Sequence, residues 1–322
     1  MLLTYIARRV LYAVFVVWAA FTLAFLALFA LPSDAVEILL GEQETLNGDS
    51  SATIDPEIAD VLRARYGLDR PPLVQYLIVL GGFLRGDFGV SMRTGIPVLQ
   101  TLGQSIPWTL QLALVGLVIS LALGVAIAVA AVSVRNPWLR QTISSLPALG
   151  ASLPVFWIGI VLIQLFSFQL GWFPAMGYGG LDTLVLPLVA IALPGAAGYA
   201  QVLIKGLADT RSQPFVDVVR AKGASEGRIL WRHVFRNATI PTLTMVGMTV
   251  GNLLSGSVVI ETVFSRDGLG RLTQTAVNGQ DTPVVLAVVV LSAAVTAAVN
   301  LIVDLLYPLI DPRIATPGVR AS

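Results

Sequence analysis

The chain has 322 residues, of which 56% are hydrophobic and only 12% are charged. Soluble globular proteins carry about 25% charged residues, so this chain has too little polar surface to cover itself in water and is expected to fold in a bilayer. The formal net charge of +1 gives no indication of nucleic-acid binding. The sequence contains no cysteine, which excludes disulfides, thiol nucleophiles and zinc–thiolate sites.

Six apolar stretches are long enough to cross a bilayer, which takes about 20 residues in a helix. The first, residues 10–31, follows the start MLLTYIARRV and lacks a small-x-small cleavage site, so it is predicted to be a retained span and not a signal peptide. The other five are predicted over residues 107–134, 141–170, 183–204, 238–260 and 282–303. The sequence therefore predicts an all-α membrane protein with six transmembrane helices.

The segment between the first two spans, residues 32–106, carries ten acidic residues against five basic ones. Its residues 55–67 have the start and stop signals of a capped helix, namely Asp55, Pro56, Glu57 and Gly67. Residues 73–84 are apolar but too short to span, so they predict a helix that lies at the membrane interface. The whole segment is either a docking surface for an extracytoplasmic partner or a solvated loop packed on the helix ends.

The placement of Lys and Arg residues predicts the orientation of the chain. With the N-terminus inside, thirteen of them fall in inner segments and two in the short outer segments, while the long outer segment counts for little. Both termini are therefore predicted to be cytoplasmic. The predicted parts are a cytoplasmic N-terminus (1–9), a first transmembrane helix (10–31), an extracytoplasmic region (32–106), a transmembrane core with the other five helices (107–310) and a cytoplasmic tail (311–322).

The densest charge cluster lies between the fourth and fifth spans, in residues 206–238, which we call the charged loop. Ser212, Gln213 and Pro214 form a helix start signal, and Gly223 is a natural helix stop. Ser225 is a candidate N-cap for a second helix, with Glu226 in its first turn. In that helix one face carries apolar residues and another basic ones. These are Ile229, Leu230, Val234 and, at the edge, Trp231 on the first face, and Arg228, Arg232 and Arg236 on the second.

Basic residues beside a span follow from the positive-inside rule and from contact with anionic lipid headgroups, which explains about half of the charges in the charged loop. Lipid contacts do not explain why the segment forms two short helices joined at Gly223. They also do not explain why two apolar side chains, Trp231 and Phe235, are presented toward the cytosol. These features favour a docking element for a soluble partner. Asn237 and Pro241 are predicted to form the turn into the next span.

Several chemistries are excluded or disfavoured by the sequence. The two lysines, Lys205 and Lys222, do not follow the glycine that a Walker loop requires, so ATP binding of that kind is not expected on this chain. The single histidine, His233, lies in the charged loop, which disfavours an intramembrane serine protease. Glu261 and Asp304 lie near opposite ends of their spans, about 30 Å apart, too far for an aspartyl dyad.

No charged residue falls in the middle of a span, which disfavours an ion-coupled secondary transporter. The polar residues at or near membrane depth are candidates for either the transport pathway or structural contacts. These are Asn252, Glu261 and Asp304. For Glu261 and Asp304 a structural role is the favoured interpretation, and for Asn252 the two are equal.

Six motifs occur in a fixed order along nearly the whole chain. They are ARR (7–9), RYGLDRPPLVQYLIVLGGFLRGDFGVSMRTGIPV (65–98), SLPVFWIGIVLIQLF (152–166), RAKGASEGRILWRHVFRNATIP (220–241), IETVFSRDGLGRL (260–272) and NLIVDLLYPLIDPRI (300–314). Together they resemble the permease subunits of peptide- and nickel-class ABC importers, the dipeptide/oligopeptide permease family. The resemblance implies a type I ABC importer permease fold in a bacterial cytoplasmic (inner) membrane.

The resemblance also implies that the charged loop lies in a groove on an ATP-hydrolysing subunit and couples closure of that subunit to helix movement. The positions implied are Asp217, Arg220, Ala221, Lys222, Gly223, Ala224, Trp231, His233, Phe235, Arg236, Asn237 and Pro241. Gly223 is expected to let the two helices of the loop pack at a sharp angle. The implied partners are a second homologous permease, two ABC ATPase subunits, an extracytoplasmic substrate-binding protein and membrane lipid, with no nucleic acid.

The resemblance implies no catalytic residue, metal or cofactor on this chain, since ATP and Mg would bind the partner ATPases. Di- or oligopeptides are the expected cargo, while nickel, other chelates, glycoconjugates and haem stay open. An ion-coupled transporter and a scaffold without transport are the weaker alternatives. The chain departs from the family pattern at 217–219, where Asp-Val-Val replaces Glu-Ala-Ala. It departs again at 32–35, where PSDA replaces Pro-Gly-Asp-Pro and an acidic insert, 37–50, follows.

Overall fold

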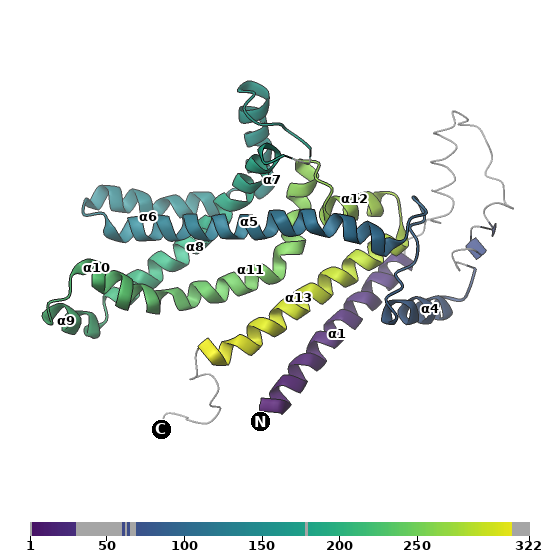
Figure 1. The fold of residues 1–322 in the computed structure, drawn as a ribbon, viewed down its shortest axis with the longest axis horizontal. Helices are drawn as coiled ribbons and strands as arrows, with labels where there is room; N and C mark the ends of the chain where they lie inside the picture. Colours follow the sequence, from purple (N-terminus) through teal and green to yellow (C-terminus); the bar gives the residue numbers. More distant parts are fainter. Residues whose placement is uncertain (1, 30–59, 62, 65–68, 178–179, 311–322) are drawn as a thin grey trace. The chain divides into compact units, whose positions relative to one another are not determined.

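The computed structural model describes residues 2–29, 60–61, 63–64, 69–177 and 180–310, and Figure 1 shows the course of the chain. Side chains at 2–5, 29, 250–257 and 303–310 are outside the description. Throughout the described ranges the regular elements are helices, and the nearest approach to a strand is one isolated bridge between Val90 and Pro97. The all-α prediction is confirmed. The predicted helix at 55–67 and the insert at 37–50 lie outside the described residues.

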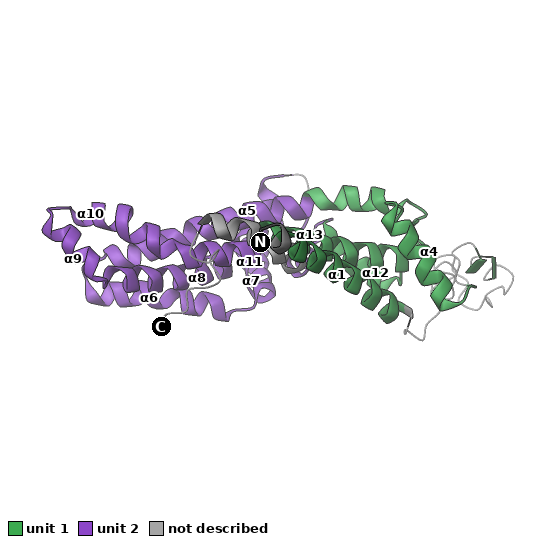
Figure 2. Ribbon diagram, turned by 90° about the horizontal axis from the view of Figure 1, so that it is seen from below, with its two compact units in different colours: residues 1–107, 268–322 green, residues 108–267 purple. Residues whose placement is uncertain are grey.

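The chain divides into two compact units, which Figure 2 colours separately. The first consists of residues 1–107 and 268–322, and the second of residues 108–267. Helix α5 (Val98–Ser133) runs from the first unit into the second. The charged loop belongs entirely to the second unit.

The first unit is built on two long apolar helices, α1 (Leu2–Phe29) and α13 (Thr282–Ile310), which pack against each other. The short helix α4 (Pro72–Leu84) joins them through aromatic contacts: Tyr76 and Phe83 meet the buried ring of Phe21 edge-on, with centroids 5.5 and 5.3 Å away. Such edge-to-face geometry suits the charge distribution of aromatic rings. The helix predicted over 73–84 is confirmed.

Helix α12 (Leu269–Asn278) leads into α13 through a turn that is held by Asp281. The buried Asp281 carboxylate accepts hydrogen bonds from the Ser91 hydroxyl and, at 3.1 Å, from the backbone N–H of Met92. A buried carboxylate needs such donors because burial without them is costly. This contact fixes the segment that precedes α5 against the start of α13.

The second unit is organised around α8 (Asp182–Arg211), which packs against α6 (Pro137–Ser152), α7 (Val155–Leu162) and α11 (Phe235–Val263). The buried side of α8 is rich in small side chains, including Ala190, Ala196, Ala197 and Ala200. Small residues let helix backbones approach closely in membrane proteins, where apolar surface alone does not drive association. The remaining elements are η1 (Ile163–Gln169), α9 (Pro214–Ala221), α10 (Glu226–Arg228) and η2 (Ile229–Val234).

The span predicted over 141–170 is a bent pair of helices and not one continuous helix. The chain forms two helical pieces, Pro137–Ser152 and Val155–Gln169, that meet at an angle of 97°. Pro154 causes the break, because a proline forces the residue before it out of the helical conformation, and Leu153 is extended with ψ of 130°. The second piece ends at Gln169, next to the predicted end at Leu170. By contrast, Pro187 and Pro194 lie inside the continuous helix α8.

Four helices in the described ranges are long and apolar enough to cross a bilayer, and the bent pair makes a fifth span if it is counted as one. The other predicted span, 238–260, is helical within α11, but its residues 250–257 have no described side chains. The structure thus establishes a helical membrane protein. The count of six spans and their orientation stay predictions.

Candidate functional site

The charged loop consists of one short helix, a tight turn and the start of a much longer helical run. Helix α9 ends at Ala221, and α10, η2 and α11 then follow without interruption from Glu226 to Val263. Six residues of this run, Ile229–Val234, have the wider π-helical winding. Any force on the second half of the loop therefore acts on a continuous helix that extends through the predicted fifth span.

Helix α9 ends in a Schellman motif at Gly223, whose φ is +82°. The backbone N–H of Gly223 donates to the carbonyl oxygen of Arg220 at 2.9 Å, and the N–H of Ala224 donates to the carbonyl oxygen of Val219 at 3.4 Å. The predicted helix stop is confirmed. A Cβ at 223 would meet no atom within 4 Å, and the expectation that Gly223 sets a sharp angle between the two helices stays a prediction. Glycine is needed there for its backbone conformation and not for space.

Ser225 stands at the predicted N-cap position of the second helix with an extended backbone, but its side chain makes no capping hydrogen bond. The backbone carbonyl of Ser225 instead accepts from Ile229 at 2.9 Å. Gln213 likewise precedes Pro214 without a side-chain cap. The capping positions are thus as predicted, whereas the start of each helix is held by its own backbone and by ionic contacts.

An apolar core holds the charged loop on the membrane helices of its unit. Val216 of α9 and Ile229 and Val234 of η2 are fully buried. They pack in one cluster with Ala128 of α5, with Leu203 and Leu207 of α8, and with Ala238 of α11. The prediction that Ile229, Leu230 and Val234 share one apolar face is confirmed, and the structure shows that this face packs on the membrane helices. Burial of side chains of this size stabilises their position by about 1.5–3 kcal/mol each, so the loop is a fixed attachment.

Four charged side chains tie the loop together, and the sequence reading identified only part of this network. Arg220 contacts Asp217 at 2.7 Å and Glu226 at 2.9 Å, which joins α9 to α10. Arg211, at the end of α8, contacts the second oxygen of Glu226 at 2.7 Å and the carbonyl of Val132 at 3.2 Å. Arg211 was missed because a contact between residues 15 positions apart depends on the path of the turn.

The pKa of Glu226 is lowered by the hydrogen bond from Arg220 and by the positive charges of Arg220 and Arg211. A lowered pKa in the folded loop means that the ionised network stabilises the loop above the ordinary glutamate pKa. This contribution is lost as the pH falls through the lowered value. The network is exposed to solvent, so its effect should also weaken at high salt.

We therefore expect amide hydrogen exchange in residues 212–228 to accelerate as the pH is lowered from neutrality to about 3, after correction for the intrinsic pH dependence of exchange. The Glu226→Gln variant should exchange faster than the wild type at neutral pH and lose most of this acid response. An identical acid response in both proteins would show that Glu226 is not the responsible group. Residues 269–278 of α12 provide the internal reference for intact folding.

The charged loop also presents basic residues outside this network. Lys222, Arg228, Arg232 and Arg236 are exposed, and none of the four forms an ion pair with a described residue. Trp231 lies among them, 56% exposed, with its ring 5.1 Å from that of the half-buried Phe235. Trp231 therefore lies outside the buried face, because the π-helical winding separates it from Ile229 and Val234. Of the other implied positions, Ala221 is exposed and Ala224 packs on the core of the loop.

The predicted turn at Asn237 and Pro241 is absent, since both residues lie inside helix α11. Pro241 cannot donate a helical hydrogen bond to the carbonyl of Asn237, but one missing bond does not outweigh the burial of Val234 and Ala238 on the same helix. The Asn237 side chain donates to the carbonyl of His233 at 3.0 Å. His233 is half-buried and serves here as part of the helix.

The remaining polar candidates lie away from the charged loop. Glu261 is fully buried in the last turn of α11, and the backbone N–H of Arg266 donates to its carbonyl at 2.8 Å. Arg266, which the sequence reading missed, is also buried, with its guanidinium 5.7 Å from the Trp108 ring centroid. Burial lowers the pKa of Arg266, and the negative charges of Glu261 and Asp267 offset this effect only in part. The side chains of Asn252 and Asp304 lie outside the described residues.

The chain matches the family of binding-protein-dependent transport system inner membrane components over residues 120–316, which include the charged loop. It is 34% identical to the oligopeptide transport system permease protein AppB of Bacillus subtilis, covering 96% of this chain and 98% of that protein. It is also 34% identical to the glutathione transport system permease protein GsiC of Salmonella choleraesuis, over 90% and 92% of the two chains.

Solved structures show the same fold at lower identity. A chain of the inward-facing MetNI methionine ABC transporter matches with a TM-score of 0.56 at 18% identity, covering 66% of this chain and 96% of that one. A chain of a bacterial alginate ABC transporter matches with a TM-score of 0.53 at 14% identity, covering 82% and 99%. Together with the family match and the near full-length relatives, this fold shows that the chain belongs to the binding-protein-dependent transport system inner membrane components, as the permease subunit of an ABC importer.

Proposed function

We propose that this permease forms, with a second homologous permease, the pathway through which an ATP-driven importer moves di- or oligopeptides. Two ATPase subunits, which carry ATP and Mg, would dock on the cytoplasmic side, and an extracytoplasmic binding protein would deliver the cargo. The names of the relatives support the cargo class, since they describe oligopeptide, peptide and glutathione transport. Import of nickel, another chelate or haem would use the same mechanism.

The observation that carries the proposed coupling is the continuous helical run from Glu226 to Val263. A short helix attached to a span by a flexible turn would absorb a push, whereas a continuous helix transmits it. The buried contacts of Val216, Ile229 and Val234 add α9 to the same rigid element. An ATPase that moves the charged loop would thus move α11, and α8 with it, which is the rigid-body movement that alternating access needs.

The basic outer face of the loop is the proposed contact with the ATPase. Arg232 and Arg236 are exposed and one helical turn apart, and Trp231 supplies an exposed aromatic anchor next to them. Aromatic and arginine side chains carry much of the binding energy in protein interfaces. Arg211 and Arg220, by contrast, are committed to Glu226 inside the loop.

The Arg232→Glu/Arg236→Glu double variant is expected to retain roughly ten-fold less ATPase on purification, because two attractive charges become repulsive ones at the contact. The measurement is the amount of ATPase recovered per permease from native membranes. The matched control is Arg135→Glu/Arg320→Glu, which reverses two charges on the same predicted side but outside the loop. Equal recovery from all three proteins would assign Arg232 and Arg236 to lipid contacts instead.

The proposed function as a whole is tested by purifying the tagged chain from its native membrane in mild detergent and identifying by mass what accompanies it. A second permease and at least one ATPase with a Walker motif are the expected companions. Purified complexes in vesicles should then hydrolyse ATP faster when a peptide-loaded binding protein is added. Recovery of the folded, monodisperse chain alone would contradict the proposal and direct the search toward ion coupling.

A further inference from the structure

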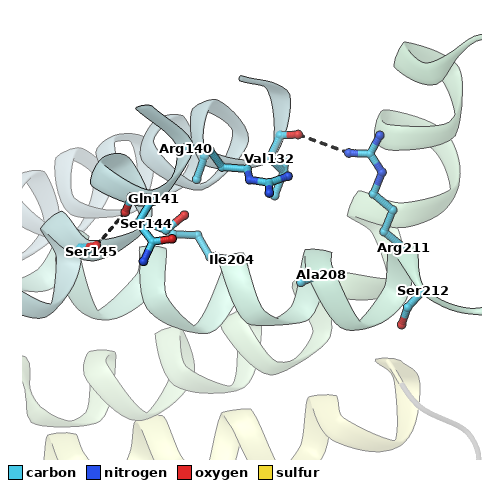
Figure 3. Close-up of a pocket in the computed structure, with 10 residues that line it drawn as sticks. Val132, Arg140, Gln141, Ser144, Ser145, Ile204, Ala208, Arg211 and Ser212 are labelled. Carbon is cyan, nitrogen blue, oxygen red and sulfur yellow. Dashed lines mark hydrogen bonds between the residues drawn. The ribbon is translucent and has the colours of Figure 1, made fainter. Parts of the chain in front are cut away.

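Two cavities follow each other along the trough between α5, α6 and α8 in the second unit, and they differ sharply in chemistry. The first, of about 610 Å³, is lined by both apolar and polar side chains, including two arginines, and Figure 3 shows the residues around it. Its polar lining consists of Arg140, Gln141, Ser144, Ser145, Arg211 and Ser212. The two arginines come from different helices, α6 and α8, and both extend toward the last turn of α5 at Val132.

The second cavity, of about 470 Å³, is lined entirely by apolar or small residues of α5, α6, α7 and α8. The two linings adjoin along the chain. Ser145 ends the first on α6 and Leu146 begins the second, while on α5 the lining passes from Ala131 in the first to Ile127 in the second. The space that carries the two arginines and the apolar space therefore follow each other along α5 and α6.

We propose that this trough binds an anionic phospholipid, with its phosphate between Arg140 and Arg211 and an acyl chain in the apolar cavity. From Val132 to Leu123 the two linings follow α5 for about 14 Å, which is roughly half of the hydrocarbon core and so about one leaflet. The arginines lie on the predicted cytoplasmic side, where anionic lipids gather. A free phosphate ion would account for the first cavity but leave the adjoining apolar one unexplained.

The charge state of the first cavity supports this ligand. The Arg140 side chain makes no hydrogen bond or ion pair with any described residue, although it lines a cavity that also holds a second arginine. Arg211 is paired with Glu226, so Arg140 is the positive charge at this space that an incoming anion would neutralise. Arginine binds phosphate oxygens through two parallel N–H donors, and the hydroxyl of Ser144 is a further donor at the same wall.

Arg211 links the proposed lipid to the charged loop. Its guanidinium already donates to Glu226 and to the carbonyl of Val132, so a phosphate that approaches it competes with Glu226 or adds to its anchoring. Mutation of Arg211 would disturb the loop as well as the cavity. Arg140 is the better test residue, because its exposed side chain contributes to the cavity alone.

The test uses the full chain, purified in mild detergent with its co-purifying subunits and titrated with phosphatidylglycerol or phosphatidylcholine, with bound lipid counted by native mass spectrometry. Phosphatidylglycerol should bind at least about five-fold more tightly than phosphatidylcholine, and the Arg140→Gln variant should lose about five-fold in phosphatidylglycerol affinity. The Arg135→Gln control removes an equal charge just after α5, outside the cavity, and should bind like the wild type. The Leu146→Glu variant places a carboxylate in the apolar trough and should also lose the lipid.

Three results would overturn the proposal. Equal affinity for the two lipids would show that the trough does not recognise an anionic headgroup. Equal losses in the Arg135→Gln and Arg140→Gln variants would reduce the effect to general positive charge at this side. Displacement of the lipid by inorganic phosphate or glycerol 1-phosphate at the same concentration, with no effect of Leu146→Glu, would identify a site for free phosphate. The assay needs neither cargo nor nucleotide, so its failure would not bear on the proposed import function.

Discussion

The Gly206→Val variant is expected to lose transport, because it separates two helices that the charged loop depends on. A Cβ at position 206 of α8 would lie 2.8 Å from the carbonyl oxygen of Ala238 and 3.5 Å from its Cα on α11. Backbone atoms cannot turn aside as a flexible side chain does, so α8 and α11 must move apart. Overpacking of this kind costs about 1–3 kcal/mol. Ala238 belongs to the core that holds the loop, so the loop loses its attachment.

Uptake of labelled peptide into cells measures the effect, together with the amount of chain in the membrane and of ATPase recovered with it. We expect insertion to persist, ATPase recovery to fall and uptake to fail. The Gly206→Ala variant should show a weaker form of the same defect, because its single methyl group already meets the carbonyl. Gly103→Val is the matched control in α5, since a Cβ there has no neighbour within 4 Å. Wild-type uptake by Gly206→Val would show that the α8–α11 contact can widen without consequence.

The Gly223→Trp variant is expected to insert normally but to separate ATP hydrolysis from transport. Space for the indole exists in the free subunit, because no atom lies within 4 Å of a Cβ at this position. The positive φ of 82° costs a residue with a side chain about 1–2 kcal/mol, which is concentrated in the turn between α9 and α10. The bulky ring would also stand in the proposed ATPase contact, next to Lys222.

Comparison with Gly223→Asn separates backbone strain from the bulk of the ring, because asparagine tolerates positive φ and adds little bulk. We expect the Asn variant to transport nearly as the wild type does, while the Trp variant hydrolyses ATP without uptake. If both variants fail equally, the backbone of the turn and not the contact surface is responsible. Normal uptake by a stably inserted Gly223→Trp variant would contradict the proposed role of the charged loop as a lever.

The charged loop divides its side chains between holding itself together and meeting a partner. The inward residues form an apolar core with α5 and α8, and the ion pairs of Glu226 close the turn. The residues left over, with Arg232 and Trp231 at their centre, point outward from a continuous helix. A loop that is fixed to the membrane helices and whose exposed face binds a partner can transmit force between two proteins. Both variants discussed above act on this arrangement, one on its attachment and one on its turn.

The sequence by itself determined the membrane class, most helix positions and the place of the charged loop. Long apolar runs report helices in a bilayer directly, because every backbone polar group there must be satisfied within the segment. Gly223 was identifiable as a helix stop because the required backbone conformation favours one residue type. The ordered motifs also predicted the family, which the family match and the relatives confirm.

Only the tertiary structure decided how these elements connect. Local signals predicted a turn at Pro241, but burial of Val234 and Ala238 against α8 keeps α11 continuous through it. At Pro154 the proline holds Leu153 out of the helical conformation, and the two helical pieces meet at an angle of 97°. The contact between Arg211 and Glu226, and the approach of Gly206 to Ala238, join residues distant in sequence. Such contacts arise when helices pack, because the energy of burying side chains then exceeds the preference of any single residue.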